Sequence, residues 1–369
     1  MKTLAGTPRA ILVDLIRPQT KKHEAIERME ELEELMRTYG GLVVVKKLQR
    51  RNHPDNRTYI GKGKVEELKT LARELNTSVL VLNNILKPGQ IYNLSEALKD
   101  EKVTVWDRVD LILSIFAKHA QSQEAKLQIE LARIRHMGPR IFGLGGEELA
   151  RQAGGIGTRG IGETNTEIMK RHLRERERRV RERLERTQKM RAEQRKNRQR
   201  NGFKTAAIVG YTNTGKTTLL NALTGRKEYA ANKLFATLDT RTGKLYLPGK
   251  NASLLVSDTI GFIRDLPPEL IEAFASTLSE TVHADVLLHV VDAGNPRRDE
   301  QIGVVEAVLR KLEIENKPII HVFNKADRLK KGEAEHVKEA FAERRPVIVS
   351  ALTNDGMDIL IERLEHVLS

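Results

Sequence analysis

The sequence contains no cysteine and few aromatic residues. Without cysteine, the protein forms no disulfide bond, has no thiolate metal site and uses no cysteine nucleophile, and this composition suits a reducing compartment. Aromatic residues make up only 4% of the 369 residues, whereas hydrophobic residues of all kinds make up 39%. Hydrophobic cores built mostly from aliphatic side chains are therefore expected, and the length suggests two or three domains.

Long hydrophobic runs are also missing. No stretch approaches the roughly 18 apolar residues that a membrane-spanning helix needs. The first apolar run, at residues 10–16, is short and contains Asp14, so it fits neither a signal peptide nor a spanning helix. We therefore expect a soluble, cytoplasmic protein, and we expect it to be a monomer.

Positive charge is in excess, and most of it lies on one segment. The net charge is +14, from 64 Lys and Arg against 50 Asp and Glu. Residues 170–204 hold 16 Lys and Arg against five Glu, an excess of +11. Glu residues four positions from Arg support a solvated helix, but an excess of this size is more than such pairing needs. It predicts a polyanionic partner, and contact with nucleic acid is the interpretation we favour.

Residues 1–115 are predicted to form an α/β domain. Short β-branched runs, typical of buried strands, alternate with segments of helical periodicity. The expected strands are residues 10–16, 42–48, 79–82 and 103–106, and the expected helices are residues 24–39, 64–75 and 88–98. Alternation of this kind favours a mainly parallel sheet covered by helices.

Residues 116–201 are predicted to form a long, basic, antiparallel helical hairpin with a glycine-rich tip. A helical pattern runs without a break over residues 109–137, and Pro139 is expected to end it. A second long helix is expected over residues 166–201. Residues 143–162 between them hold eight of the chain's 26 glycines, which exclude one stable helix because each costs about 1 kcal/mol. We expect a loop there, or a loop around a short helix at residues 147–152.

Residues 202–369, the third predicted domain, contain the clearest functional signal. A predicted strand runs into Gly210-Tyr-Thr-Asn-Thr-Gly-Lys-Thr217, which is followed by a helix. This is the G-x-x-x-x-G-K-[ST] phosphate loop in the strand–loop–helix context that it requires. In such loops backbone N–H groups cradle phosphates, so Lys216 is expected to bridge the β- and γ-phosphates and the Thr217 hydroxyl to bind Mg²⁺. A glycine turn before a helix is the structural alternative.

A second motif, Asp258-Thr-Ile-Gly261, follows another predicted strand. An Asp at this place can hold the metal through water, and the N–H of Gly261 can sense the γ-phosphate. Alone this motif is weak, but together with the phosphate loop it is strong. A loop Thr between the two motifs would bind Mg²⁺ and the γ-phosphate only in the triphosphate state, and the candidates are Thr237, Thr240 and Thr242.

The tetrad Asn324-Lys-Ala-Asp327 predicts which nucleotide is bound. The Asp327 carboxylate can accept hydrogen bonds from the N1–H and the 2-amino group of guanine, both of which adenine lacks. Each hydrogen bond to a charged group is worth roughly 1.5–3 kcal/mol, so guanine is favoured. We expect Asn324 to tie this loop to the phosphate loop, Lys325 to pack over the base, and the Ala351 N–H to face guanine O6.

Gly261 is followed by Phe262, at a position where many GTPases carry a Gln that orients the attacking water. A Phe side chain cannot hydrogen-bond to water. We therefore expect slow intrinsic hydrolysis, which a partner or a different water-positioning group accelerates.

Together these motifs resemble those of the HflX-type GTPases, in the Obg–HflX group of ribosome-associated GTPases. The similarity extends to Phe235-Ala-Thr-Leu-Asp239 and Asp258-Thr-Ile-Gly-Phe-Ile263. Tyr59-Ile-Gly-Lys-Gly-Lys-Val-Glu-Glu-Leu68 is similar to the N-terminal signature of that family, and Gly155-Ile-Gly-Thr-Arg-Gly-Ile-Gly-Glu163 is similar to its glycine-loop signature. Three separate regions agree in order, so the resemblance covers essentially the whole chain.

The resemblance implies a Ras-like G domain and favours Thr237 among the candidate threonines. It implies that Lys216, Thr237 and Gly261 are catalytic, and that Thr217, Thr237 and, through water, Asp258 hold Mg²⁺. The predicted contacts to GTP are Gly210, Tyr211, Thr212, Asn213, Thr214, Gly215, Lys216, Thr217, Thr218, Asp258, Gly261, Asn324, Lys325, Asp327, Ser350, Ala351 and Leu352.

The resemblance also implies a partner, the large ribosomal subunit, with the N-terminal domain and the hairpin facing its RNA. Stimulation of GTP hydrolysis by the ribosome, and separation of the subunits of stalled or idle ribosomes, are implied as well. Some related GTPases with Asn at the position of Asn213 use K⁺ near the phosphates, so K⁺ is a further candidate cofactor beside a plain polar loop residue. Ile161 replaces a usual Pro, Asn165 replaces a usual Lys, and a C-terminal segment of some relatives is expected to be missing after Ser369.

Three alternatives stay open at this point. The chain could be a GTPase of ribosome assembly or RNA modification. It could be an RNA-binding protein whose GTPase sets the domain arrangement. The basic helix could also hold a GTPase transiently at an anionic membrane surface, although it lacks an apolar face with large aromatic side chains.

Overall fold

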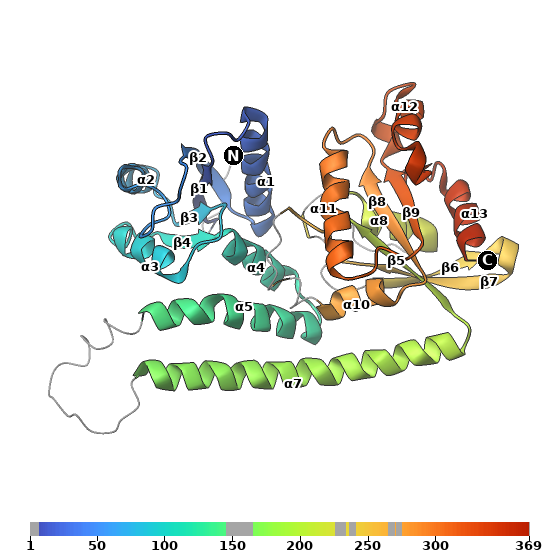
Figure 1. Cartoon of the computed structure of the whole chain (residues 1–369), viewed down its shortest axis with the longest axis horizontal. Helices are drawn as coiled ribbons and strands as arrows, with labels where there is room; N and C mark the ends of the chain where they lie inside the picture. The colour runs from blue at the N-terminus through green and yellow to red at the C-terminus, as the bar shows by residue number, and fades with distance from the viewer. Residues whose placement is uncertain are drawn as a thin grey trace. The chain divides into compact units, whose positions relative to one another are not determined.

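The computed structural model describes residues 7–144, 165–225, 234–235, 241–264, 270 and 275–368. Residues 1–118 and 126–183 form one compact unit, and residues 119–125 and 184–369 form a second. The two units are described separately below (Figure 1). None of the described helices is both long enough and apolar enough to cross a membrane.

The first unit contains a four-stranded parallel sheet with strand order β2-β1-β3-β4. Its central strands are aliphatic and buried along their length, which is typical of parallel sheets covered on both faces. Helices α2 and α3 pack on one face, and α1 and α4 lie on the other (Figure 1). This confirms the predicted α/β fold. The elements are β1 (Arg9–Ile16), α1 (Lys22–Tyr39), β2 (Leu42–Arg50), α2 (Lys62–Glu74), β3 (Val79–Leu82), α3 (Pro88–Ala97), β4 (Thr104–Asp107) and α4 (Arg108–His119).

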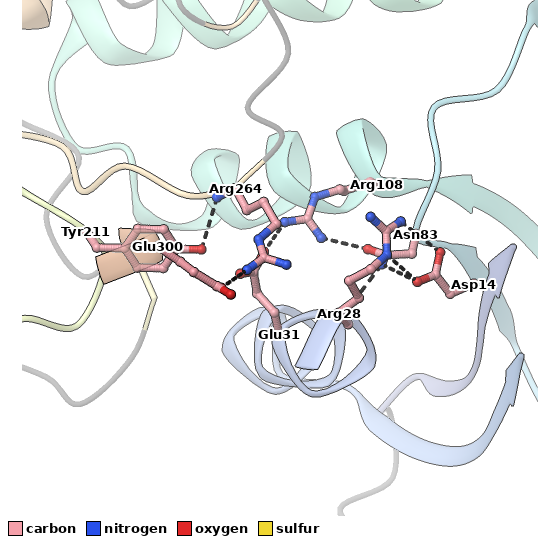
Figure 2. A network of polar contacts seen from close by, with 8 residues as sticks. All are labelled: Asp14, Arg28, Glu31, Asn83, Arg108, Tyr211, Arg264 and Glu300. Carbon is pink, nitrogen blue, oxygen red and sulfur yellow. Dashed lines mark hydrogen bonds and ion pairs between the residues drawn. The ribbon is translucent and has the colours of Figure 1, made fainter. Parts of the chain in front are cut away.

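A polar network lies where β1 and β3 end (Figure 2). The buried carboxylate of Asp14 accepts hydrogen bonds from Arg28 Nε at 2.8 Å and from Asn83 Nδ2 at 3.0 Å. Arg108 donates to Asn83 Oδ1 at 2.6 Å and forms an ion pair with Glu31. A buried charge is stable only when it is paired in this way. The network therefore fixes α1 and α4 against the sheet.

The region after α4 differs from the prediction. The continuous helix expected over residues 109–137 is wrong, because α4 ends at His119 and a new helix, α5 (Gln123–Leu144), begins after Ser122. The Ser122 hydroxyl accepts a hydrogen bond from the Ala125 N–H at 3.1 Å, which is the contact of a helix N-cap. The stop expected at Pro139 is also wrong, since α5 continues to Leu144. A proline removes only one N–H donor from the helix, and that loss does not end α5.

Helix α7 (Asn165–Arg200) agrees with the second predicted long helix, and the predicted glycine-rich tip lies outside the described residues. Val180 and Leu184 form its buried seam. In the first unit α7 lies against α5, where Arg176 pairs with Glu130 at 2.6 Å. The other charged side chains of this helix are mostly exposed and form several pairs four residues apart.

The second unit contains a six-stranded sheet with strand order β10-β9-β8-β5-β7-β6, in which only the β6–β7 pair is antiparallel. Helices α8 and α13 pack on one face, and α10, α11 and α12 pack on the other. This is the expected fold of a P-loop G domain, and the carboxyl ends of its parallel strands carry the predicted motifs. The strands are β5 (Lys204–Gly210), β6 (Arg241–Leu247), β7 (Ala252–Asp258), β8 (Val286–Asp292), β9 (Ile319–Asn324) and β10 (Val347–Ile348). The helices are α8 (Lys216–Thr224), η1 (Pro248–Lys250), α10 (Ala275–His283), α11 (Arg298–Lys311), η2 (Ala326–Arg328), α12 (Glu333–Ala340), η3 (Ala342–Arg344) and α13 (Met357–Val367).

Candidate nucleotide site

The phosphate loop connects β5 to α8, as the sequence predicts. Gly215 directly precedes α8 with φ +90°, a left-handed conformation that glycine adopts without a penalty. A side chain on Gly215 would lie 2.4 Å from Asn324 Nδ2, so this position has no room for one. Thr214 stabilises the turn by donating from Oγ1 to the Tyr211 carbonyl at 3.0 Å. The loop thus presents the start of a helix, where N–H groups favour an anion.

Lys216 lies buried beneath this loop. Its Nζ donates to the carbonyls of Tyr211 at 2.7 Å and Gly210 at 3.3 Å. Burial lowers the pKa of Lys216 to about 8, nearby Asp258 opposes that shift, and the positive charge of Lys325 adds to it. A polyphosphate in the loop would favour the charged form, because an anion close to an ammonium group raises its pKa.

Thr217 and Asp258 form a pair of oxygen ligands at the end of the loop. The Thr217 hydroxyl donates to Asp258 Oδ2 at 2.8 Å, and Asp258 is fully buried at the end of β7. Because the hydroxyl proton of Thr217 points toward the carboxylate, the lone pairs of its oxygen stay available to a cation. Hard oxygen atoms beside a phosphate site are the ligands that Mg²⁺ prefers, so these residues fit that ion.

The tetrad at the end of β9 is tied to the phosphate loop by two side chains. Asn324 Nδ2 donates to the Thr214 carbonyl at 3.0 Å, and Asn324 Oδ1 accepts from the Ala351 N–H at 3.0 Å. Lys325 Nζ donates to the Asn213 carbonyl at 2.6 Å. The structure therefore brings together the loops that follow β5, β9 and β10, although the first lies more than a hundred residues before the other two in the sequence.

Asp327 is held by Ser350, whose Oγ donates to Asp327 Oδ1 at 2.6 Å. Ser350 also accepts from the Thr353 N–H at 3.2 Å, which shapes the loop containing Ala351 and Leu352. Leu352 is 74% exposed, a high value for a large hydrophobic side chain. The position of Leu352 in this loop is suited to covering a flat ring.

The sequence did not single out Asp292, the last residue of β8. Its Oδ2 pairs with Lys325 Nζ at 2.7 Å, and both side chains are only 14% exposed. Lys325 thus links a carboxylate on one strand to a carbonyl of the phosphate loop. The available signal was an Asp that directly follows the apolar run of a strand, at the sheet edge where the other motif residues lie.

The side chain of Tyr211 reaches the segment that follows β7. Its hydroxyl accepts a hydrogen bond from the backbone N–H of Arg264 at 3.0 Å, as Figure 2 shows. Its backbone carbonyl accepts hydrogen bonds from Lys216 Nζ and Thr214 Oγ1 within the phosphate loop.

The segment after β7 lies along the phosphate loop. A side chain on Gly261 would lie 2.8 Å from Lys216 Nζ, so this glycine packs directly against the lysine. Phe262 is 1% exposed and belongs to a hydrophobic cluster with residues of α10 and α11. It therefore presents no polar atom toward the site, as its residue type predicts. Thr218 follows Thr217 in the first turn of α8, whereas Thr237 lies outside the described residues.

Three family models match successive parts of the chain. Residues 26–117 match a model described as "GTP-binding GTPase N-terminal", and residues 119–198 match "GTP-binding GTPase Middle Region". Residues 205–325 match "50S ribosome-binding GTPase".

Solved structures with a similar fold cover nearly all of the chain. One is described as a complex of SsGBP with GDP, with 26% identity, a TM-score of 0.55 and 98% of both chains covered. Another is a GTP-binding protein from the archaeon Sulfolobus solfataricus in complex with GDP, with 25% identity, a TM-score of 0.50 and the same coverage. A similar fold is therefore also found in GTP-binding proteins solved with GDP.

Curated relatives are similar over the same length. The chain is 45% identical to "GTPase HflX" of Caldanaerobacter subterraneus subsp. tengcongensis, over 98% of this chain and 80% of that protein. It is 38% identical to "GTPase HflX" of Escherichia coli K12, over 98% of this chain and 83% of that protein. With its phosphate loop and guanine tetrad joined as described above, the chain belongs to the HflX family of P-loop GTPases.

Proposed function

We propose that this protein hydrolyses GTP, binds the large ribosomal subunit, and separates or rescues stalled or idle ribosomes. The observation that carries the proposal is the direct connection of Asn324 and Lys325 to the phosphate loop. It joins a site for guanine to a site for phosphates within a domain whose family model is described as a 50S ribosome-binding GTPase.

Guanine is recognised at the tetrad. The Asp327 carboxylate, which Ser350 holds by one oxygen, accepts hydrogen bonds from the base. Lys325 packs over one face of the base, and Leu352 covers the open side. The Ala351 N–H, which donates to Asn324 Oδ1 at 3.0 Å in the structure, turns toward O6 when the base binds. Adenine would leave the carboxylate without a donor from the base, at a cost of about 1–3 kcal/mol or more.

Phosphate binding and hydrolysis use the loop beneath. Backbone N–H groups of residues 210–218 hold the phosphates, and Lys216 offsets charge between the β- and γ-phosphates. The Gly261 N–H contacts the γ-phosphate while water attacks in line. Thr217, Thr237 and, through water, Asp258 hold Mg²⁺, which supplies further charge neutralisation when bound. K⁺ beside Asn213 is a further candidate.

Hydrolysis by the isolated protein is expected to be slow. Phe262 is buried and offers no group that could orient water, so the water must be positioned by a partner or by another residue. Turnover of several per second by the purified protein alone would contradict this point.

We propose three functional parts with boundaries at residues 1–115, 116–201 and 202–369. The basic residues of α7 are mostly exposed, and neutralising phosphates with such residues gives strong, salt-dependent binding to RNA. The N-terminal part and the hairpin therefore face ribosomal RNA, while the G domain controls their affinity through its nucleotide.

Co-sedimentation in sucrose gradients tests this function. Purified protein is mixed with ribosomes or separate subunits in the presence of GTP, GDP or a non-hydrolysable GTP analogue. We expect it to sediment with the large subunit in the GTP-analogue state and to convert whole ribosomes into subunits. A matched Lys216→Ala variant controls for charge-driven binding, because it keeps the basic hairpin and loses the phosphate contact.

Other outcomes would replace the proposal. Binding only to incomplete large-subunit particles would indicate a role in ribosome assembly. Nucleotide-independent binding to RNA without subunit release would indicate an RNA-binding protein whose GTPase sets the domain arrangement. Binding to anionic vesicles at the expense of ribosomes would indicate a membrane-surface role.

A further inference from the structure

Tyr211 connects the phosphate loop to the segment that contains Gly261. The chain after β7 runs parallel to the start of the loop, where Phe262 N–H donates to the Gly210 carbonyl at 3.1 Å and Thr212 N–H donates to the Phe262 carbonyl at 2.8 Å. The Tyr211 hydroxyl adds a third bond, from the Arg264 N–H at 3.0 Å. Figure 2 shows the tyrosine ring reaching the backbone of Arg264.

Gly261 thus lies between two side-chain anchors. Upstream, the buried Thr259 hydroxyl donates to the Ile208 carbonyl of β5 at 2.7 Å. Downstream, the Tyr211 hydroxyl holds Arg264. A shift of Gly261 toward the loop is blocked by Lys216 and by the Thr212 backbone, which a side chain at Gly261 would approach to 2.8 Å and 3.0 Å. Its N–H is therefore held in place from both sides.

The downstream anchor depends on the tyrosine hydroxyl and not on the Arg264 side chain. The Arg264 guanidinium instead pairs with Glu300 in the first turn of α11. Glu300 is half-exposed, and ion pairs of this kind contribute little. A neutral hydrogen bond such as that of Tyr211 is worth about 0.5–1.5 kcal/mol.

We propose that Tyr211 is a positioning residue for GTP hydrolysis, which acts by fixing the Gly261 N–H against the γ-phosphate. This inference rests on the proposed function, since Gly261 matters only if a triphosphate occupies the loop. GDP has no γ-phosphate, so its binding should not depend on the Tyr211 hydroxyl. The hydroxyl should therefore influence the hydrolysis rate and the preference for triphosphate, and leave GDP affinity as it is.

The test compares Tyr211→Phe with Tyr246→Phe. The control also removes one hydroxyl hydrogen bond, from Tyr246 Oη to Asn251 Oδ1 at 2.8 Å, but at an exposed site away from the nucleotide. Single-turnover GTP hydrolysis, the Kd values for GDP and for a non-hydrolysable GTP analogue, and the thermal midpoint are measured for each. For Tyr211→Phe we expect the rate and the analogue affinity to fall about 2- to 12-fold with unchanged GDP affinity.

Glu300→Gln serves as a second variant, because it removes the negative charge that pairs with the Arg264 side chain and keeps the Arg264 N–H. We expect it to match the wild-type protein. Equal loss of GDP and analogue affinity in Tyr211→Phe, or a wild-type rate in that variant, would overturn the inference. The GTPase part of the proposed function has a separate test in the same data, because it fails if the wild-type protein neither binds nor hydrolyses GTP.

Discussion

Changing Asp292 to Asn removes the charge that holds Lys325 and should weaken binding of every guanine nucleotide. Asp292 Oδ2 lies 2.7 Å from Lys325 Nζ, and the same ammonium group donates to the Asn213 carbonyl at 2.6 Å. Without the carboxylate, Lys325 of the nucleotide-free variant can turn toward water. Nucleotide binding must then return it to its place over the base without its partner.

The size of the effect follows from the burial of the pair. Exposed ion pairs contribute up to about 1 kcal/mol, and breaking a fully buried pair costs about 3–5 kcal/mol. Because both side chains are 14% exposed, we expect an intermediate loss. A loss of about 2 kcal/mol corresponds to roughly 30-fold weaker binding. GDP and a GTP analogue should be affected equally, because Lys325 contacts neither the γ-phosphate nor its ligands.

Equilibrium titration with fluorescent GDP and with a fluorescent GTP analogue measures both affinities. Asp299→Asn is the matched control, because it makes the same change of charge at an exposed position in the first turn of α11. We expect that control to bind within about twofold of the wild type, since exposed single charges have small effects. An Asp292→Asn variant that also bound within this range would refute the assignment of Asp292 as the residue that positions Lys325.

The guanine site, the phosphate loop and a buried histidine each give one further prediction. Asp327→Asn should abolish the preference for GTP over ATP in competition titrations, and a retained preference would contradict the assignment of the guanine site. Gly215→Ala should weaken nucleotide binding at least about tenfold through its contact with Asn324, whereas Gly225→Ala, with a positive φ but open space, should only lower the thermal midpoint. Burial, and then the neighbouring His321, lower the pKa of His289 to about 3, so the folded protein keeps His289 neutral while the unfolded chain takes up a proton. The free energy of unfolding should therefore fall by about 1 kcal/mol from about pH 6.5 to about pH 5.5 in urea titrations, and His289→Asn should lack this contribution; an equal pH slope in both proteins would contradict the assignment.

Much of the fold could be predicted because its signals are local. The strand at β3 begins and ends where the aliphatic run does, and most other expected elements agree to within two residues. The break between α4 and α5 was missed because Ser122 acts through one capping bond, which the helical spacing of the apolar residues does not reveal. The stop expected at Pro139 was wrong because it rested on a local rule, that a proline ends a helix. That rule does not decide where α5 ends.

Some residues of the nucleotide site could likewise be predicted from local signals, and others could not. The phosphate loop and the tetrad could be found because backbone geometry and base recognition demand particular residues at fixed spacing. Asp292 and the hydroxyl of Tyr211 are different, because each contacts a residue that only the folded sheet brings near, 33 and 53 positions away. Their residue types are compatible with many surroundings, so nothing in the sequence distinguishes them from other polar residues near a strand end.

Two separate pairs of side chains connect the loops of the nucleotide site. Asn324 and Lys325 connect the guanine loop to the phosphate loop, while Thr259 and Tyr211 connect the Gly261 segment to β5 and the same loop. In the proposed mechanism, the first pair acts on any guanine nucleotide, and the second acts only when a γ-phosphate is present. A single rigid loop cannot make that distinction, because it would respond to GDP and GTP alike. We therefore propose that the separate anchoring of the Gly261 segment allows this G domain to respond to the γ-phosphate.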